Sequence, residues 1–359
     1  MKKNAFYAQS GGVTSVINAT AAAVIQEARR FPNQINKVYA GKNGILGALR
    51  ENLIDTSKES KKLIDSLYCR PGGVFGSCRY KLKSLDENAK EYKRLIEVFK
   101  AHDIGYFFYN GGNDSADTAY KVSQISKSLG YDLTCIAIPK TVDNDLAVTD
   151  TCPGFGSVAK YVAISTQEAS LDVQSMMESS TKVFILEVMG RHAGWLTAAS
   201  TLGKSTEEDG PHLVYVPENV FKIKGFLKEV KEVYDALGRC VVAVSEGIHK
   251  EEGEYFLQTY ASETGSGLTG KKDSHGNIQL SGSGALGDTL TNIVTEHIDG
   301  ARVRADTFGY LQRSFLADVS EVDAEEAERV GQHAVFALSL IHISEPTRRY
   351  AISYAVFCL

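Results

Sequence analysis

The feature that most constrains the fold is a repeated order of short apolar runs, polar or glycine-rich turns, and segments with helical spacing. Apolar runs end in such turns at residues 5–8, 37–40, 106–109, 135–138, 183–188 and 240–244. Segments with an apolar residue every three or four positions lie between them, as at residues 16–30, 92–102 and 157–177. This order predicts an α/β fold in which helices cover both faces of parallel sheets.

Length and charge narrow the class of protein further. A chain of 359 residues suggests two domains. Its net charge of −5 gives no support to a nucleic-acid partner. No run approaches the ~20 apolar residues of a membrane span, so we expect no membrane partner. The six cysteines form no CxxC pair, which favours reduced thiols in a cytoplasm over a disulfide or zinc framework.

The stretch Asn110–Ser115 (NGGNDS) follows one of the apolar runs directly. Ligands of parallel sheets bind beyond the carboxyl ends of the strands, which is where this stretch falls. Its paired glycines allow backbone N–H groups to approach an anion, and the next helix adds positive potential at its N-terminus. A plain tight turn remains the commoner explanation of a Gly-Gly pair taken alone.

The stretch Pro139–Asp145 (PKTVDND) supplies a lysine, a hydroxyl and two carboxylates after the next predicted strand. If this segment is extended, Asp143 and Asp145 point to the same side, because they stand two positions apart. One carboxylate could then deprotonate a hydroxyl while the other binds Mg²⁺. Lys140 could neutralise charge on a phosphate. A solvated Asp-Asn-Asp turn is the alternative interpretation.

Further candidates come from basic segments and from acids at strand ends. A second glycine-rich loop at residues 72–81 includes Arg79 and suits a polyphosphate, with a basic surface loop as the alternative. The segment Arg304–Arg313 suits a sugar phosphate, with a solvated basic face as the alternative. Glu218 and Glu246 each follow a strand-like run, where an acid can accept hydrogen bonds from sugar hydroxyls or lie in a surface turn.

Together these motifs resemble the phosphofructokinase family, and within it the pyrophosphate-dependent members. The resemblance covers residues 4–337 and rests on GGNDS, PKTVDND, EVMGRHAGW, VPE, SEG and FGYLQR, which occur in the family's order and spacing. It implies two Rossmann-like parallel-sheet domains with the active site in the cleft between them. Residues 1–155 plus about 312–337 would bind the phosphoryl donor, and residues 156–311 would bind fructose 6-phosphate.

The resemblance also implies residue roles for the sugar. Asp143 matches the base that takes the proton from the 1-hydroxyl, and Lys140 and Arg191 match groups near the transferred phosphate. The implied sugar-binding set is Thr141, Asp143, Lys182, Met189, Gly190, Arg191, Glu218, Arg304, Tyr310 and Arg313, and Thr141 also counts as catalytic. Part of this set comes from a neighbouring subunit in the family, so a homodimer or homotetramer is implied. Lys182 stands where many members have an arginine.

For the donor, the resemblance implies that pyrophosphate is bound rather than ATP. ATP-dependent members have glycine where Asp114 and Lys140 stand. Asp114 would fill the space of an α-phosphate and repel its charge, whereas Lys140 would attract a terminal phosphate. The implied donor-binding set is Gly11, Gly12, Arg79, Gly112, Asp114 and Lys140, with Mg²⁺ held by Asn113 and Asp145. Asn113 replaces an aspartate that is common in the family, and its amide oxygen is a neutral ligand.

The implied activity is reversible, Mg²⁺-dependent phosphoryl transfer from pyrophosphate to the 1-hydroxyl of D-fructose 6-phosphate. The products are fructose 1,6-bisphosphate and phosphate, as in glycolysis. Three alternatives stay open: ATP as donor, another acceptor such as sedoheptulose 7-phosphate, and a non-catalytic sugar-phosphate-binding protein on the same fold. The presence of Asp143, Asp145 and Arg191 favours the enzyme, because a sensor needs no base.

Residues 338–359 stand apart from these patterns. The blocks LSLIHISEPTR and ISYAVFCL resemble the translation of a sequencing-library adapter. Residues 321–337 form a helical pattern that runs into this tail without a stop signal. We therefore expect the authentic sequence to end near Ala337 and leave the tail out of the fold prediction. An unusual native C-terminus is the alternative.

Overall fold

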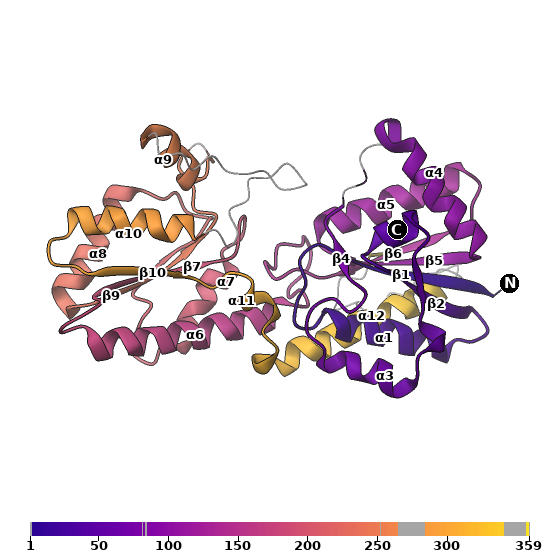
Figure 1. The fold of residues 1–359 in the computed structure, drawn as a ribbon, viewed down its shortest axis with the longest axis horizontal. Coiled ribbons are helices and arrows are strands. Elements are labelled where there is room, and N and C mark those ends of the chain that lie inside the picture. The colour runs from indigo at the N-terminus through magenta and orange to yellow at the C-terminus, as the bar shows by residue number, and fades with distance from the viewer. Residues whose placement is uncertain are drawn as a thin grey trace. The chain divides into compact units, whose positions relative to one another are not determined.

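The computed structural model describes residues 2–80, 82, 85–251, 253–264, 284–340 and 357–358. Contacts within the chain divide it into two compact α/β units (Figure 1). The first unit comprises Met1–Val142, Leu146–Gly156 and Val319–Leu359, and the second comprises Asp143–Asp145 and Ser157–Asp318. Most of the tail that we expect to be adapter-derived, residues 341–356 and 359, lies outside the described residues.

The sheet of the first unit has the order β11-β6-β5-β1-β2-β3, with β4 also paired to β1. The pairs β1–β2, β1–β4, β1–β5 and β5–β6 are parallel, whereas β3 and β11 pair antiparallel at the two edges. The strands are β1 (Lys3–Ser10), β2 (Ile35–Gly41), β3 (Leu53–Asp55), β4 (Ser77–Cys78), β5 (Ile104–Gly111), β6 (Thr134–Pro139) and β11 (Phe357–Cys358). The expected parallel α/β sheet is confirmed.

Helices cover both faces of this sheet, because successive strand residues point to opposite sides. Tyr7 and Phe108 face the core beneath α1 and α12, while Phe6 and Phe107 face the core beneath α4 and α5 (Figure 1). The helices of this unit are α1 (Ile17–Arg30), α2 (Ile45–Leu49), α3 (Lys61–Asp65), α4 (Leu85–Ala101), α5 (Asn113–Ser128) and α12 (Glu321–Leu340), with 3-10 turns η1 (Thr56–Lys58) and η2 (Ser66–Cys69).

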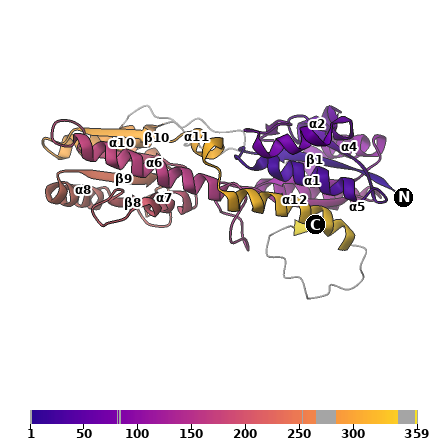
Figure 2. The same cartoon turned by 90° about the horizontal axis from the view of Figure 1, so that it is seen from below.

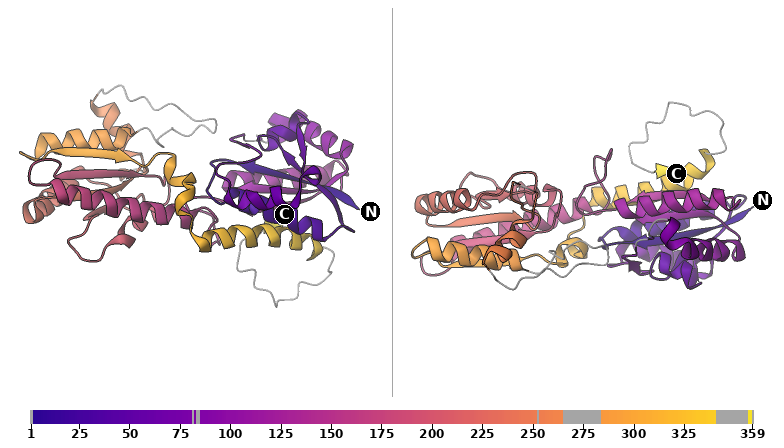
Figure 3. Two further views of the ribbon diagram at one scale, coloured as in Figure 1. Left: turned by 60° about the horizontal axis from the view of Figure 1, so that its bottom comes forward. Right: turned by 90° about the horizontal axis from the view of Figure 1, so that it is seen from above.

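Helix α12 packs closely against α1, although the whole second unit separates them in the sequence (Figures 2 and 3). Gly331 makes this approach possible, because a Cβ there would lie 2.7 Å from the Thr20 carbonyl oxygen and 2.8 Å from the Ala23 Cβ. Val330, Ala334 and Val335 of α12 belong to the same core cluster as the inner residues of α1. The C-terminal helix therefore completes one face of the first unit.

The second unit has a parallel sheet with the order β10-β7-β9-β8. Val183 and Ile185 of β7 face the core beneath α8 and α10, while Phe184 and Leu186 face α6 (Figure 1). Its strands are β7 (Val183–Val188), β8 (Leu213–Tyr215), β9 (Cys240–Ser245) and β10 (Val303–Thr307). Its helices are α6 (Phe155–Met176), α7 (Trp195–Ala199), α8 (Ile223–Leu237), α9 (Phe256–Thr264), α10 (Ala285–His297) and α11 (Leu311–Ser314), with η3 (Ser200–Gly203) and η4 (Leu316–Asp318).

The unit boundaries differ in three details from those expected from the sequence. Asp143–Asp145, which we expected in the donor-binding domain, group with the second unit. The main break after them lies between Gly156 and Ser157, one residue later than expected. Residues 312–318, which we expected in the donor-binding domain, group with the second unit. The reason is that Gln312 bonds to the end of β7 and that Lys160 of α6 forms an ion pair of 2.8 Å with Asp318.

Two observations bear on the environment of the chain. No helix among the described residues is both long and apolar enough to cross a membrane. Among the described cysteines, Cys69, Cys78 and Cys240 are free thiols.

Candidate active site

The turn after β1 brings glycine backbone to the carboxyl edge of the first sheet. Gly11 has a φ of +77°, a left-handed conformation that favours glycine. Its N–H donates to the Cys78 carbonyl oxygen at 3.0 Å, and the Ser77 hydroxyl donates to the Gly11 carbonyl oxygen at 2.7 Å. Strand β4 therefore fixes the turn that contains Gly11 and Gly12.

Lys140 lies against this turn. Only 5% of the residue is exposed, and its Nζ donates to the Gly12 carbonyl oxygen at 2.7 Å. A Cβ on Gly11 would lie 3.3 Å from the same Nζ, and one on Gly112 would lie 3.7 Å from the Lys140 carbonyl oxygen. The structure thus brings four predicted donor-binding residues together: Gly11, Gly12, Gly112 and Lys140. A buried amine beside bare backbone is chemically suited to an oxyanion.

The remaining predicted donor residues stand at the same edge of the sheet. Asn113 and Asp114 begin α5 directly after β5, and both are exposed. Arg79 follows β4 and is also exposed. Asn113 and Asp114 thus follow the carboxyl end of β5, and Arg79 follows that of β4, a short strand inside the segment that sequence reasoning treated as a glycine-rich loop.

Sequence reasoning missed Asn18, which supports the loop before Arg79. Asn18 is fully buried in α1, and its amide donates to the Arg70 and Gly72 carbonyl oxygens at 2.9 and 2.7 Å. Its Oδ1 accepts from the Val74 N–H at 3.0 Å. One side chain therefore fixes three backbone groups of the glycine-rich loop. The available signal was an amide within the mostly apolar first half of α1.

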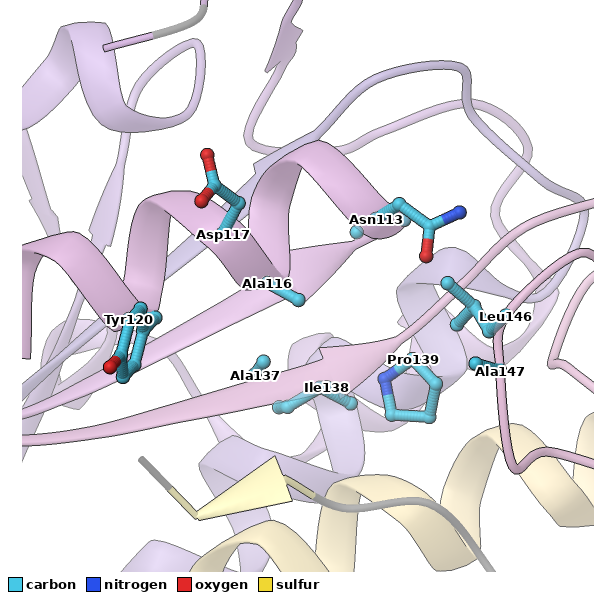
Figure 4. Close-up of a pocket in the computed structure, with 11 residues that line it drawn as sticks. Asn113, Ala116, Asp117, Tyr120, Ala137, Ile138, Pro139, Leu146 and Ala147 are labelled. Carbon is cyan, nitrogen blue, oxygen red and sulfur yellow. The ribbon is translucent and has the colours of Figure 1, made fainter. Parts of the chain in front are cut away.

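A separate cavity of about 260 Å³ opens beside Gly112, between α5 and β6 (Figure 4). Its wall is mostly apolar and includes Ala116, Ile138 and Leu146. No lysine or arginine is among its described lining residues, and its Asp117 pairs with Lys121 at 2.6 Å. This cavity is therefore poorly suited to a polyphosphate, unlike the glycine turns on the Lys140 side.

The segment that contains the predicted base is a turn, not a strand. Thr141 forms an isolated bridge with Gly154, and Asn144 has a φ of +52°. Asparagine tolerates this left-handed conformation better than most residues do. The premise that an extended backbone aligns Asp143 with Asp145 is therefore wrong. Their approach to a ligand depends on this turn instead.

In the second unit, the predicted sugar-binding residues Met189, Gly190 and Arg191 follow β7. Gly190 has a φ of +131°, and its carbonyl oxygen accepts from the Ser245 hydroxyl at 2.5 Å. A Cβ on Gly247 would lie 2.0 Å from the Arg191 carbonyl oxygen, so only glycine fits there. The end of β9 thus holds the Gly190–Arg191 turn in place.

The two acids at strand ends occupy different surroundings. Glu246 is 6% exposed, and its N–H donates to the Val188 carbonyl oxygen at 2.9 Å, so it lies beside the end of β7, just before the Gly190–Arg191 turn. Glu218 accepts from the Gly194 N–H at 2.7 Å, at the start of α7. Both acids were candidates, but the sequence-based set included Glu218 and left Glu246 out. The structure places Glu246 beside the Met189–Arg191 turn.

The segment after β10 contains the predicted phosphate clamp. The Arg313 guanidinium carbon lies 4.0 Å from the centre of the Tyr310 ring, in a cation–π contact. Tyr310 is 57% exposed, so its ring faces outward, whereas Arg313 is half-buried. Gln312 between them is 2% exposed and was missed by sequence reasoning.

Glu187 anchors three segments of the second unit near this site. Its carbonyl oxygen accepts from the Phe308 N–H at 3.3 Å, and its Oε2 accepts from the Gly287 N–H at 2.9 Å, at the start of α10. The side chain is almost completely buried, and this burial raises the pKa of its carboxyl above the usual 4.5. A helix N-terminus is a favourable partner for this acid.

Two predicted sugar-binding residues lie at the other end of the second sheet. Lys182 precedes β7, whereas Arg191 follows it, so the six-residue strand separates them by roughly 20 Å. Arg304 is paired in register with Phe184, close to the amino end of β7. The second unit therefore does not bring Lys182 and Arg304 together with Met189, Gly190 and Arg191.

Comparison with known proteins decides the family. The model of the phosphofructokinase family matches residues 4–338. The chain belongs to the phosphofructokinase family. It is 53% identical over 332 residues to a pyrophosphate–fructose 6-phosphate 1-phosphotransferase of Xanthomonas campestris, covering 92% of this chain and 76% of the relative. It is 50% identical over 333 residues to the protein of the same name from Methylococcus capsulatus, covering 93% and 76%.

A solved phosphofructokinase has the same fold. The crystal structure of a pyrophosphate-dependent phosphofructokinase from Marinobacter aquaeolei is 53% identical in sequence and superposes with a TM-score of 0.80. The match covers 94% of this chain and 76% of that protein. The predicted α/β fold with two Rossmann-like units is thereby confirmed.

Phosphofructokinases transfer a charged group, and a hard metal ion that binds this group needs oxygen ligands from the protein. Among the described residues, no group of three or more acidic, histidine or cysteine side chains forms a metal cage. Mg²⁺ commonly binds through one or two protein oxygens plus substrate phosphates and water. Asn113 at the start of α5 offers a neutral amide oxygen and Asp145 offers a carboxylate oxygen, both of which are ligand types that Mg²⁺ accepts.

Proposed function

We propose that this phosphofructokinase catalyses reversible phosphoryl transfer from pyrophosphate to the 1-hydroxyl of D-fructose 6-phosphate. The products are fructose 1,6-bisphosphate and inorganic phosphate. The names of relatives at 50% and 53% identity support this activity. The structural observation that supports it best is Lys140, whose nearly buried amine lies 2.7 Å from the Gly12 carbonyl oxygen beside the glycine turn.

The choice of donor follows from charge and space at this turn. A buried ammonium group attracts a compact, highly charged diphosphate strongly, because screening by water is weak there. Asp114 stands in the first turn of α5, where its carboxylate would repel the α-phosphate of a nucleotide. Both features favour pyrophosphate over ATP. Gly11, Gly12 and Gly112 supply backbone that can approach the phosphates, and Arg79 adds a second cation.

In the proposed reaction, Asp143 accepts the proton of the sugar 1-hydroxyl as that oxygen attacks the terminal phosphorus. The bond from this phosphorus to the bridging oxygen breaks, and inorganic phosphate leaves. Lys140 and Arg191 stabilise the charge that the transferred group bears in the transition state. Thr141 orients the phosphoryl group between donor and acceptor.

The sugar is held by groups of the second unit. Met189 and Gly190 form the wall next to the reacting end, and Tyr310 and Arg313 bind the 6-phosphate. Glu246, together with or in place of Glu218, accepts hydrogen bonds from sugar hydroxyls. Its burial and its position level with Val188 support this role.

We further propose that Mg²⁺ serves as the cofactor and that Asn113 and Asp145 hold it. When bound, Mg²⁺ supplies positive charge to the phosphate oxygens. The neutral amide of Asn113 and the lack of a larger acidic cage among the described residues support a metal that arrives with the donor.

A homodimer or homotetramer is part of the proposal. Lys182 and Arg304 lie at the amino end of the second sheet, too far along it to join Arg191 in the same copy. A neighbouring copy could present these cations to the 6-phosphate. The free thiols of Cys69, Cys78 and Cys240 support a reducing, cytoplasmic location.

A donor-competition assay tests the function directly. Purified protein is assayed with fructose 6-phosphate and Mg²⁺, with either pyrophosphate or ATP as donor. We expect turnover with pyrophosphate in both directions and little with ATP. The double change Asp114→Gly with Lys140→Gly should raise the use of ATP relative to pyrophosphate. Robust turnover of the unaltered protein with ATP alone would refute the donor assignment.

A further inference from the structure

Gln312 occupies an unexpected environment for its type. It is 2% exposed, although it lies in the short helix α11, where the neighbouring Tyr310 and Leu311 are 57% and 65% exposed. A polar side chain is therefore buried while adjacent aromatic and apolar side chains face outward. Burying an amide is costly unless its hydrogen bonds are made inside the protein. The contacts of Gln312 show which bonds compensate this cost.

The amide bridges the ends of two strands. Its Oε1 accepts from the Met189 N–H at 3.2 Å, directly after β7. Its Nε2 donates to the carbonyl oxygen of Gly309 at 2.9 Å, in the turn after β10. Gly309 has a φ of +52° and Gly190 has a φ of +131°, so both turns use backbone conformations that favour glycine. One side chain thus contacts both glycine turns.

This bridge lies where the sheet itself no longer connects the two segments. The pairing of β7 with β10 ends at Glu187 and Thr307. Beyond that point, the chain after β7 leads to Arg191 and the chain after β10 leads to Arg313. The Phe308 N–H still donates to the Glu187 carbonyl oxygen at 3.3 Å, and Gln312 provides the next connection outward. Its length therefore sets how far apart the two turns lie.

We propose that Gln312 is a positioning residue that sets the distance between the turn at the reacting end of the sugar and the clamp for its distal phosphate. It thereby selects acceptors by chain length. This inference rests on the proposed function, because it takes Met189–Arg191 and Tyr310–Arg313 as the two ends of the acceptor site. Gln312 itself touches backbone and acts on the sugar through these neighbours.

Two variants separate positioning from simple stability. Gln312→Met keeps the length of the side chain and removes both hydrogen bonds. Gln312→Glu keeps an acceptor for the Met189 N–H, but it donates to Gly309 only when the new carboxyl is protonated. Burial raises the pKa of such a carboxyl. Gln174→Met is the matched control, since Gln174 is an exposed residue of α6 in the same unit.

The measurements are KM and kcat with fructose 6-phosphate and pyrophosphate, together with kcat/KM for sedoheptulose 7-phosphate, an acceptor one carbon longer. For Gln312→Met we expect the KM of fructose 6-phosphate to rise roughly tenfold, as for the loss of a buried hydrogen bond, with the KM of pyrophosphate within about twofold. The ratio of kcat/KM for fructose 6-phosphate to kcat/KM for sedoheptulose 7-phosphate should fall. For Gln312→Glu, the KM of fructose 6-phosphate relative to wild type should fall as pH is lowered.

Two results would overturn the proposal. The first is an equal rise in the KM of both substrates in Gln312→Met, or no change in either KM. The second is a Gln312→Glu variant whose KM for fructose 6-phosphate, relative to wild type, does not depend on pH. If Gln312→Met does not fold, the pH profile of Gln312→Glu decides. If the wild type turns over neither donor, the proposed function fails. Calorimetric binding of fructose 6-phosphate then tests Gln312 separately, and unchanged affinity in both variants refutes its positioning role.

Discussion

The two units prepare their sites in different ways. In the first unit, buried polar groups support the glycine turns: Asn18 fixes three backbone groups of one loop, and Lys140 lies nearly buried against another. In the second unit, Tyr310 of the proposed clamp faces outward and Arg313 is half-buried, and hydrogen bonds from Ser245 and Gln312 connect the backbone turns.

The difference follows from what each unit is proposed to bind. Pyrophosphate is small and rich in charge, so a rigid cradle with a buried cation suits it. A sugar phosphate is longer and has few charges, so the spacing between two turns matters more than one strong contact. Under this proposal, the first unit selects its ligand by charge, and the second selects its ligand by length.

The largest effect on activity should come from substitution of Asp143. This residue is proposed to accept the proton of the sugar 1-hydroxyl and not to bind either substrate. We expect Asp143→Ser to lower kcat by a factor on the order of 10³, with both KM values nearly unchanged. Steady-state kinetics with each substrate varied in turn measure this. Asp132→Ser, at an exposed position of the first unit, is the control. A large rise in either KM would show that Asp143 also belongs to one of the two binding sites.

Lys140 should give the next largest effect, restricted to the donor. Lys140→Met removes the ammonium group and keeps most of the side-chain volume, so we expect the KM of pyrophosphate to rise roughly 10- to 100-fold. The KM of fructose 6-phosphate should stay within about twofold. Lys127→Met, on an exposed part of α5, should behave as wild type. A matching rise for fructose 6-phosphate would mean that the two units do not divide the substrates as proposed.

The smallest effect concerns the pH dependence of stability in the second unit. Burial raises the pKa of Glu187 above 4.5, so the folded state retains a proton that the unfolded chain releases. The stability that wild type derives from this group is present at low pH and is lost as pH rises through the raised pKa. Glu187→Gln keeps an acceptor for the Gly287 N–H and removes the titration.

We therefore expect the melting temperature of Glu187→Gln, relative to wild type, to increase as pH rises from about 5 to 8. Thermal melts at a series of pH values measure this difference. Glu296→Gln, an exposed position of α10, should follow wild type at each pH. A constant difference between Glu187→Gln and wild type would argue against a raised pKa at Glu187.

The sequence predicted the α/β class and the edges of the sheets where site residues gather, because apolar runs and polar turns mark strand ends directly. The grouping of Lys140 with Gly11 came instead from the resemblance to the phosphofructokinase family. The sequence did not predict the turn at Asn144. Asparagine tolerates a left-handed backbone conformation but does not require it, so whether this conformation forms depends on the surrounding structure.

Supporting residues were harder to identify from the sequence than the residues they support. Gln312 and Asn18 act through contacts between segments that are far apart in the chain, and no local pattern shows which backbone group an amide will reach. The choice of Glu218 over Glu246 had the same cause. Both acids follow strand-like runs, and only the neighbouring strand distinguishes them. Local sequence patterns identify where the strands end. Which residues lie next to those strand ends depends on the fold.

The packing of α12 on α1 has a consequence for biosynthesis. Domains generally fold as they leave the ribosome, starting from the N-terminus. Here the N-terminal unit cannot bury the face of α1 until the ribosome has translated Val330 and Val335, after the whole second unit has been made. While the second unit is being translated, the apolar face of α1 that α12 later covers therefore stays exposed to water and to chaperones.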